Sequence, residues 1–75
     1  MNEVWIGYER IPYHDPEVYC VTEEATEAML IIDDIESLRS ESRLIWQLEE
    51  DSYEAYGTSS YVVKKVTMNE RISLK

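Results

Sequence analysis

Two short stretches of the sequence contain residue types that carry out acid–base or nucleophilic chemistry. His14 and Asp15 are neighbours between two prolines, where a loop could hold them as a general acid and base. Cys20 could act as a nucleophile only if a base approached it, and its place in a run of β-branched and aromatic residues predicts a small buried apolar side chain instead. Neither stretch forms part of a recognisable triad, so we expect a protein that is not an enzyme.

Clustered carboxylates could instead bind a hard cation such as Ca²⁺. Asp33, Asp34 and Glu36 form one cluster, and residues 49–51 form another. Neither has the alternating oxygen ligands and central glycine of an EF-hand loop, and adjacent residues of a helix point in different directions. The sequence also contains no zinc ligand set and no phosphate-binding glycine loop. We therefore expect no metal and no other cofactor.

The strongest chemical signal is net charge. The 75 residues include sixteen Asp and Glu against seven Lys and Arg, a formal net charge of −9. Residues 15–54 alone hold thirteen acids and two arginines, whereas residues 55–75 hold one acid and four bases. Such a chain repels nucleic acid and anionic membranes and attracts basic surfaces. We expect a basic partner surface, and no direct binding to nucleic acid or to a membrane.

The first elements that would position these carboxylates are a β-hairpin and a helix. Val4–Tyr8 and Val18–Val21 have strand composition and flank a loop with two prolines. Thr22 is the expected N-cap of a helix that ends near residues 39–41. At 100° per residue, Glu23, Glu27 and Asp34 fall on one side of this helix. The opposite, apolar arc is expected to contain Ala25, Ala28, Met29, Ile31, Ile32, Ile35 and Leu38.

A second helix is predicted over residues 42–56, with Gly57 as its C′ residue. Leu44, Trp46 and Leu48 alternate as a strand would, so the strand interpretation stays open for this segment. Tyr61–Met68 is predicted as a strand with Val62, Val66 and Met68 on one face, and residues 69–75 as a loose tail. The chain then forms a single α+β domain over residues 1–75. Its predicted order is β-β-α-α-β, a mostly antiparallel three-stranded sheet with helices on one face.

The outer sides of the two predicted helices would form one continuous anionic surface. Carboxylates four residues apart on a helix are separated by about 6 Å along the axis, and a DNA strand carries a charge every ~3.4 Å. Such a surface could occupy a basic groove that normally binds nucleic acid, although acidic helices also serve simply to keep a protein soluble. The predicted partner-binding residues are Glu23, Glu27, Asp33, Asp34, Glu36, Glu50, Asp51 and Glu54, with Tyr53 as an aromatic anchor.

The aromatic content supports a second hypothesis. Six Tyr and two Trp exceed what so small a core can hide, and these residue types favour protein interfaces. A homodimeric scaffold or regulatory subunit that pairs through an aromatic sheet face is the alternative function. The lone cysteine, the absence of a signal sequence and an apolar run of only five residues indicate a cytoplasmic protein.

The layout of the chain resembles that of small acidic accessory proteins encoded by phages and mobile elements. The resemblance lies in three stretches: residues 4–9 (Val-Trp-Ile-Gly-Tyr-Glu), residues 18–29, in which a strand leads into Thr-Glu-Glu-Ala, and the closing strand at residues 61–66. Anti-CRISPR and anti-restriction inhibitors belong to this group, and they block host enzymes that bind nucleic acid. The resemblance implies an inhibitor and provides no motif from which individual site residues can be carried over.

Overall fold

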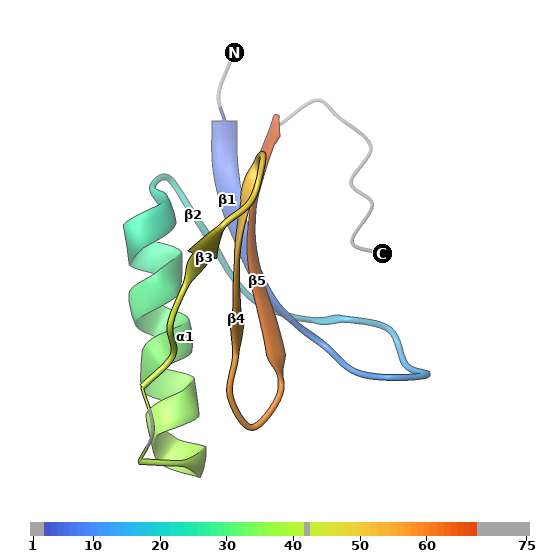
Figure 1. Ribbon diagram of the computed structural model, residues 1–75. Helices are drawn as coiled ribbons and strands as arrows, with labels where there is room; N and C mark the ends of the chain where they lie inside the picture. Colours follow the sequence, from blue (N-terminus) through green and yellow to red (C-terminus); the bar gives the residue numbers. More distant parts are fainter. Residues whose placement is uncertain (1–2, 42, 68–75) are drawn as a thin grey trace.

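The computed structural model describes residues 3–41 and 43–67, which form a five-stranded antiparallel sheet with one helix packed against one face (Figure 1). The elements are β1 (Glu3–Arg10), β2 (Glu17–Thr22), α1 (Ala25–Arg39), β3 (Gln47–Leu48), β4 (Ser52–Tyr56) and β5 (Ser60–Thr67). The strand order is β2-β1-β5-β4-β3, so the first and last strands of the chain pair at the centre of the sheet. The α+β class is confirmed, whereas the prediction of three strands and two helices is wrong.

The N-terminal hairpin is confirmed. β1 and β2 pair antiparallel, with Ile6 opposite Val21 and Gly7 opposite Cys20. The register then shifts, because Tyr8 lies opposite Val18. Tyr19 is the extra residue of this bulge, and bulges re-aim side chains next to functional or packed sites. Here Tyr19 turns toward the C-terminal end of α1, where its hydroxyl contacts Arg39.

The helix begins two residues later than predicted. Glu24 is the N-cap, without a side-chain cap hydrogen bond, and Thr22 Oγ1 donates instead to the Glu24 carbonyl at 2.7 Å. Thr22 therefore closes a local turn rather than capping the helix, and Glu23 lies outside it. The predicted end is confirmed, because α1 stops at Arg39 and the Ser40 N–H donates to the Glu36 carbonyl at 2.8 Å.

The side of α1 that faces the sheet is narrower than the predicted apolar arc. Ala28, Ile32 and Glu36 are buried, whereas Ile31 is exposed and Leu38 is 89% exposed. The helix approaches β1 closely: a Cβ on Gly7 would lie 2.9 Å from Ile32 Cδ1. Small residues at the contact bring the helix near the sheet, and residues at the margins of the arc, such as Ile31 and Leu38, then turn toward solvent.

The predicted second helix over residues 42–56 is wrong, and the alternation that favoured a strand was the better guide. Leu44 is buried, Ile45 is exposed and Trp46 packs against the core, as expected for extended chain. β3 pairs with β4, and the acidic residues 49–51 form the turn between them. Gly57 lies in the turn between β4 and β5 and caps no helix.

Apolar side chains collect on both faces of the sheet. The cluster under α1 contains Ala28, Ile32, Leu44, Ala55, Tyr61 and Val63. The cluster on the other face contains Ile6, Tyr8, Val62 and Val66. The predicted face of this strand is thus confirmed for Val62 and Val66, with Tyr61 and Val63 on the opposite face, while Met68 and the predicted tail lie outside the described residues.

Candidate interaction surface

The predicted carboxylates do not form one continuous surface, because the second helix that was to carry three of the eight is absent. Glu27 and Asp34 on α1 and Glu23 just before it are exposed, and we call these three residues the outer acidic face. Residues 49–51 are exposed in the β3–β4 turn, and we call them the turn cluster. Six of the exposed carboxylates therefore lie in two separate groups.

The ion pairs of the described residues lie elsewhere. Arg10 pairs with Glu54 at 3.0 Å, Arg39 with Glu9 at 3.0 Å, and Lys65 with Glu3 at 3.3 Å. No cation in residues 3–41 and 43–67 forms an ion pair with the outer acidic face. Within the described part of the chain, the negative charge of this face therefore has no ion-pair partner.

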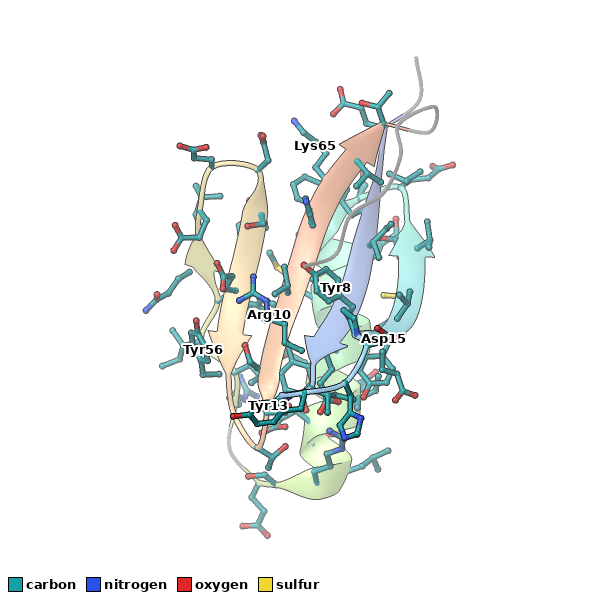
Figure 2. All side chains as sticks on the ribbon, turned by 90° about the vertical axis from the view of Figure 1, so that its right-hand side faces the viewer. Tyr8, Arg10, Tyr13, Asp15, Tyr56 and Lys65 are labelled. Carbon is teal, nitrogen blue, oxygen red and sulfur yellow. The ribbon has the colours of Figure 1, made fainter. Side chains whose placement is uncertain are left out.

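Three predicted contact residues have other roles. Glu36 is 1% exposed, so its inclusion among partner-binding residues is wrong. Glu54 is held by Arg10 on the sheet face away from α1, where Figure 2 shows Arg10 close to Tyr8 and Tyr56. Tyr53 packs against the core under α1, with its ring 5.7 Å from that of Trp5.

Glu36 belongs instead to a partly buried polar network that joins α1 to the sheet. Its carboxylate accepts hydrogen bonds from the Thr58 N–H at 2.8 Å, from Thr58 Oγ1 at 2.6 Å and from the Tyr61 hydroxyl at 2.9 Å. Burial raises the pKa of the Glu36 carboxyl, but the hydrogen bonds from Thr58 and Tyr61 and the charge of Arg39 outweigh burial and hold that pKa below its usual value. The Glu36 carboxylate is thus charged and fully satisfied.

Arg39 extends this network to the hairpin. Its guanidinium donates to the Tyr61 hydroxyl at 3.1 Å, to Glu9 at 3.0 Å and to the Tyr19 hydroxyl at 3.2 Å, and Tyr19 in turn donates to Glu9. Burial raises the pKa of Glu9, and the hydrogen bonds from Tyr19, Ser59 and Arg39 more than reverse that effect. The last turn of α1 is therefore anchored to β1, β2 and β5.

The sequence contains a signal for this network that the prediction of Glu36 as a partner contact overlooked. Glu36 follows Ala28 by eight residues and Ile32 by four, so the same 100° spacing places it in the middle of the buried arc. Gly57 is the matching feature on the sheet side, since a Cβ there would overlap a Glu36 carboxylate oxygen. A carboxylate at the centre of an apolar arc is expected to have hydrogen-bond donors as partners.

The outer side of α1 combines its carboxylates with exposed apolar residues. Leu30 is 64% exposed, and Leu38, two turns later, is almost fully exposed. Asp34 lies between them on the same line along the helix, because residues four apart share a face. Apolar and acidic side chains therefore alternate along the exposed side of α1.

A groove runs between this side of α1 and the chain that follows it. Its volume is about 470 Å³, within the range of about 300–1,000 Å³ found for small-ligand sites. Residues of the helix and of the segment after it line its two walls: Leu30, Asp33, Asp34, Ser37, Glu41, Arg43 and Leu44. Asp33, predicted to contact a partner, is half-buried along this groove.

The residues that could have carried out catalysis lie apart from this surface. His14 is exposed in the β1–β2 loop, and Cys20 is half-buried in β2 against the core under α1, where burial raises its thiol pKa. A protonated thiol is a poor nucleophile. Within the described part of the chain, no three His, Cys, Asp or Glu side chains are placed to hold a metal ion together.

The aromatic residues also lie differently from the arrangement required for an aromatic dimer face. Trp5, Trp46 and Tyr53 pack on the helix side of the sheet, and Tyr61 is buried there. Tyr8 is buried on the other face, and Tyr56 is exposed at that face. The described aromatic residues therefore mainly complete the core, and this geometry adds no support for a homodimer formed through an aromatic sheet.

These features define a small α+β domain in which one helix covers one face of a five-stranded antiparallel sheet. Comparisons of the chain with protein-family models, with curated proteins and with solved structures found no match. No helix in the described residues is long and apolar enough to cross a membrane.

Proposed function

We propose that this protein is a cytoplasmic binding protein that occupies the basic surface of a nucleic-acid-binding protein and thereby inhibits it. The observation that carries the proposal is the outer acidic face, whose three carboxylates have no cationic partner among the described residues. A net charge of −9 on 75 residues adds long-range attraction toward a basic surface. The same charge repels nucleic acid, so the partner is a protein.

The spacing of the carboxylates supports competition with nucleic acid. Glu27 and Asp34 are seven residues apart, which corresponds to about 10.5 Å along a helix axis. That separation is about three phosphate steps of a DNA strand, at ~3.4 Å each. One helix offers a short array, so the proposal is competition at a limited basic patch rather than imitation of a long duplex.

Exposed leucines support a protein partner rather than a diffuse ionic association. Leu30 and Leu38 flank Asp34 on the outer side of α1. Burial of exposed apolar surface contributes about 25 cal/mol per Å² and does not depend on salt in the way that charge pairing does. A partner that covers this side would therefore be bound by charge and retained by apolar contact.

Charge reversal on the helix tests this function directly. The wild-type chain, immobilised, is used to capture proteins from a lysate of its source cells at low salt, and the captured proteins are identified and then challenged with duplex DNA. We expect the captured proteins to be nucleic-acid-binding proteins, and we expect duplex DNA to release them from the immobilised chain. The variant carrying Glu23→Lys, Glu27→Lys and Asp34→Lys should lose them.

The matched control reverses the same number of charges in the turn cluster, through Glu49→Lys, Glu50→Lys and Asp51→Lys. This control should retain most of the captured protein, because the turn cluster is separate from α1. Capture that survives reversal of the outer acidic face, or that duplex DNA does not displace, rules out the proposed function.

A further inference from the structure

The groove beside α1 has an apolar part and a charged rim. Leu30 and Leu44 contribute the apolar part, and Leu44 is buried against the core. Asp33 and Asp34 stand on the helix wall, and Glu41 stands on the wall formed by the segment after the helix. A ligand in this groove would meet apolar surface mainly at Leu30, with carboxylates on two sides.

The charge of the groove is not balanced from within. Arg43 is the one cation in its lining, and it forms no ion pair with a carboxylate in the described part of the chain. The groove lining therefore holds three carboxylates and one arginine, and this arginine forms no ion pair with any of the three. By charge complementarity, the groove suits a cationic group that reaches both walls.

We propose that this groove holds an arginine side chain of the basic partner, an inference that rests on the proposed function and specifies its contact. The aliphatic stem of an arginine packs along apolar surface while its charged end stays polar, which matches leucines beside carboxylates. Its planar guanidinium has five N–H donors and can bind more than one carboxylate at once. A lysine ammonium is a compact, strongly hydrated charge that makes less use of two separated walls.

The test uses a hexa-arginine peptide as the probe and the ¹⁵N-labelled wild-type protein at low salt. Amide resonances of residues 30–44 should shift and saturate with added peptide, while those of the turn cluster shift less. A hexalysine peptide of equal charge should bind more weakly. Hexalysine binding as tight as that of hexa-arginine overturns the assignment to arginine.

Two variants with equal loss of charge separate the groove from net charge. One carries Asp33→Asn, Asp34→Asn and Glu41→Gln, and the other carries Glu49→Gln, Glu50→Gln and Asp51→Asn. We expect about tenfold weaker hexa-arginine binding for the first and no more than about threefold for the second, because only the first removes charge-assisted hydrogen bonds. Ser37→Tyr, which fills the groove without changing charge, should also weaken binding, whereas Val18→Tyr at an exposed position of β2 should not.

The outcomes distinguish the groove from the function it serves. One outcome is that the two neutralised variants lose hexa-arginine affinity equally and that resonance shifts spread over both acidic groups. This outcome rules out the groove as the arginine site and leaves the proposed charge-driven binding intact. An absence of hexa-arginine binding to the wild-type chain at low salt overturns the groove and the proposed function together.

Discussion

At the scale of single residues, Glu36 is the buried carboxylate that joins α1 to Thr58 and Tyr61. Its carboxylate is nearly inaccessible to solvent and accepts three hydrogen bonds, two from Thr58 and one from Tyr61. A buried charge is stable only where donors replace the water it has lost. The close packing of Gly57 against this carboxylate leaves no room for a larger residue on that side.

Glu36→Gln should destabilise the fold although it preserves size and shape. The glutamine amide nitrogen cannot accept a hydrogen bond, so at least one of the three donors loses its partner. We expect the free energy of unfolding to fall by about 1–3 kcal/mol, the cost of an unsatisfied buried polar group. Urea denaturation measures this change. Glu27→Gln, on the exposed side of the same helix, is the control and should change stability by less than about 0.5 kcal/mol.

The same residue predicts how stability depends on pH. The pKa values of Glu36 and Glu9 are lowered in the folded protein, from an unfolded value near 4.5. Their contribution to stability is therefore fully present above that value and is lost as the pH falls through the folded pKa. Denaturation curves measured from about pH 6 to about pH 3 should show this loss, and Glu36→Gln should make it shallower. An equally steep loss in the variant would contradict the assignment to Glu36.

At the scale of elements, the position of α1 decides which apolar residues stabilise the protein. Ile32 is buried against the sheet, whereas Leu38 belongs to the exposed outer side. The sequence periodicity predicted both residues in one apolar arc. The effect of substituting each residue on stability therefore distinguishes the observed orientation of the helix from the predicted one.

Ile32→Ala should lower the free energy of unfolding by about 2–5 kcal/mol, as expected for a large-to-small change in a packed core. Leu38→Ser should change it by less than about 0.5 kcal/mol, since an exposed side chain buries little on folding. Thermal or chemical denaturation of the two variants gives the comparison. A loss at Leu38 as large as that at Ile32 would mean that the outer side of α1 is covered in solution.

The elements that were predicted correctly are those whose signals are local. The prolines at positions 12 and 16 and the flanking β-branched residues mark the hairpin, and the polar residues after Leu38 mark the end of α1. Residues 42–56 were predicted incorrectly because helical and strand periodicities overlap over a short segment, and pairing with β5 decides between them. Residues 52–56 form strand β4 because they pair with β5.

The candidate site was predicted in part for the same reason. Glu27 and Asp34 depend only on helical spacing and are exposed, and Glu23 is exposed just before the helix. Glu36 and Glu54 depend on what a distant strand or loop places beside them, Thr58 in one case and Arg10 in the other. Neither partner is close in sequence, so no local pattern could assign these two partners. The groove depends on where Glu41, Arg43 and Leu44 lie relative to the helix, which is also a tertiary feature.

At the scale of the whole molecule, the excess of negative charge has two opposing consequences. Carboxylates that attract a basic partner also repel one another, and this repulsion destabilises the compact chain. The three ion pairs of the described residues involve side chains that are mostly well exposed, and exposed pairs contribute only about 0–1 kcal/mol each. Self-repulsion should therefore outweigh them, and any treatment that screens charge should favour the folded state.

Salt should consequently raise stability while it lowers affinity. Between about 0.1 M and about 1 M NaCl the Debye length falls from about 10 Å to about 3 Å, which screens repulsion between exposed carboxylates and attraction to a partner alike. We expect Tm to rise by about 4 °C or more, equivalent to about 1 kcal/mol for a domain of this size, while hexa-arginine binding weakens.

The variant with the neutralised turn cluster supplies the control, because its lower net charge should make its Tm respond less to salt. A Tm that falls with salt would show that ion pairs outweigh self-repulsion, and the outer acidic face would then have to be balanced by cations of the chain itself. Binding that resists salt would place the main contact on Leu30 and Leu38 rather than on the carboxylates. If the outer acidic face has no cationic partner in solution, as among the described residues, salt should raise the Tm and lower the affinity for hexa-arginine.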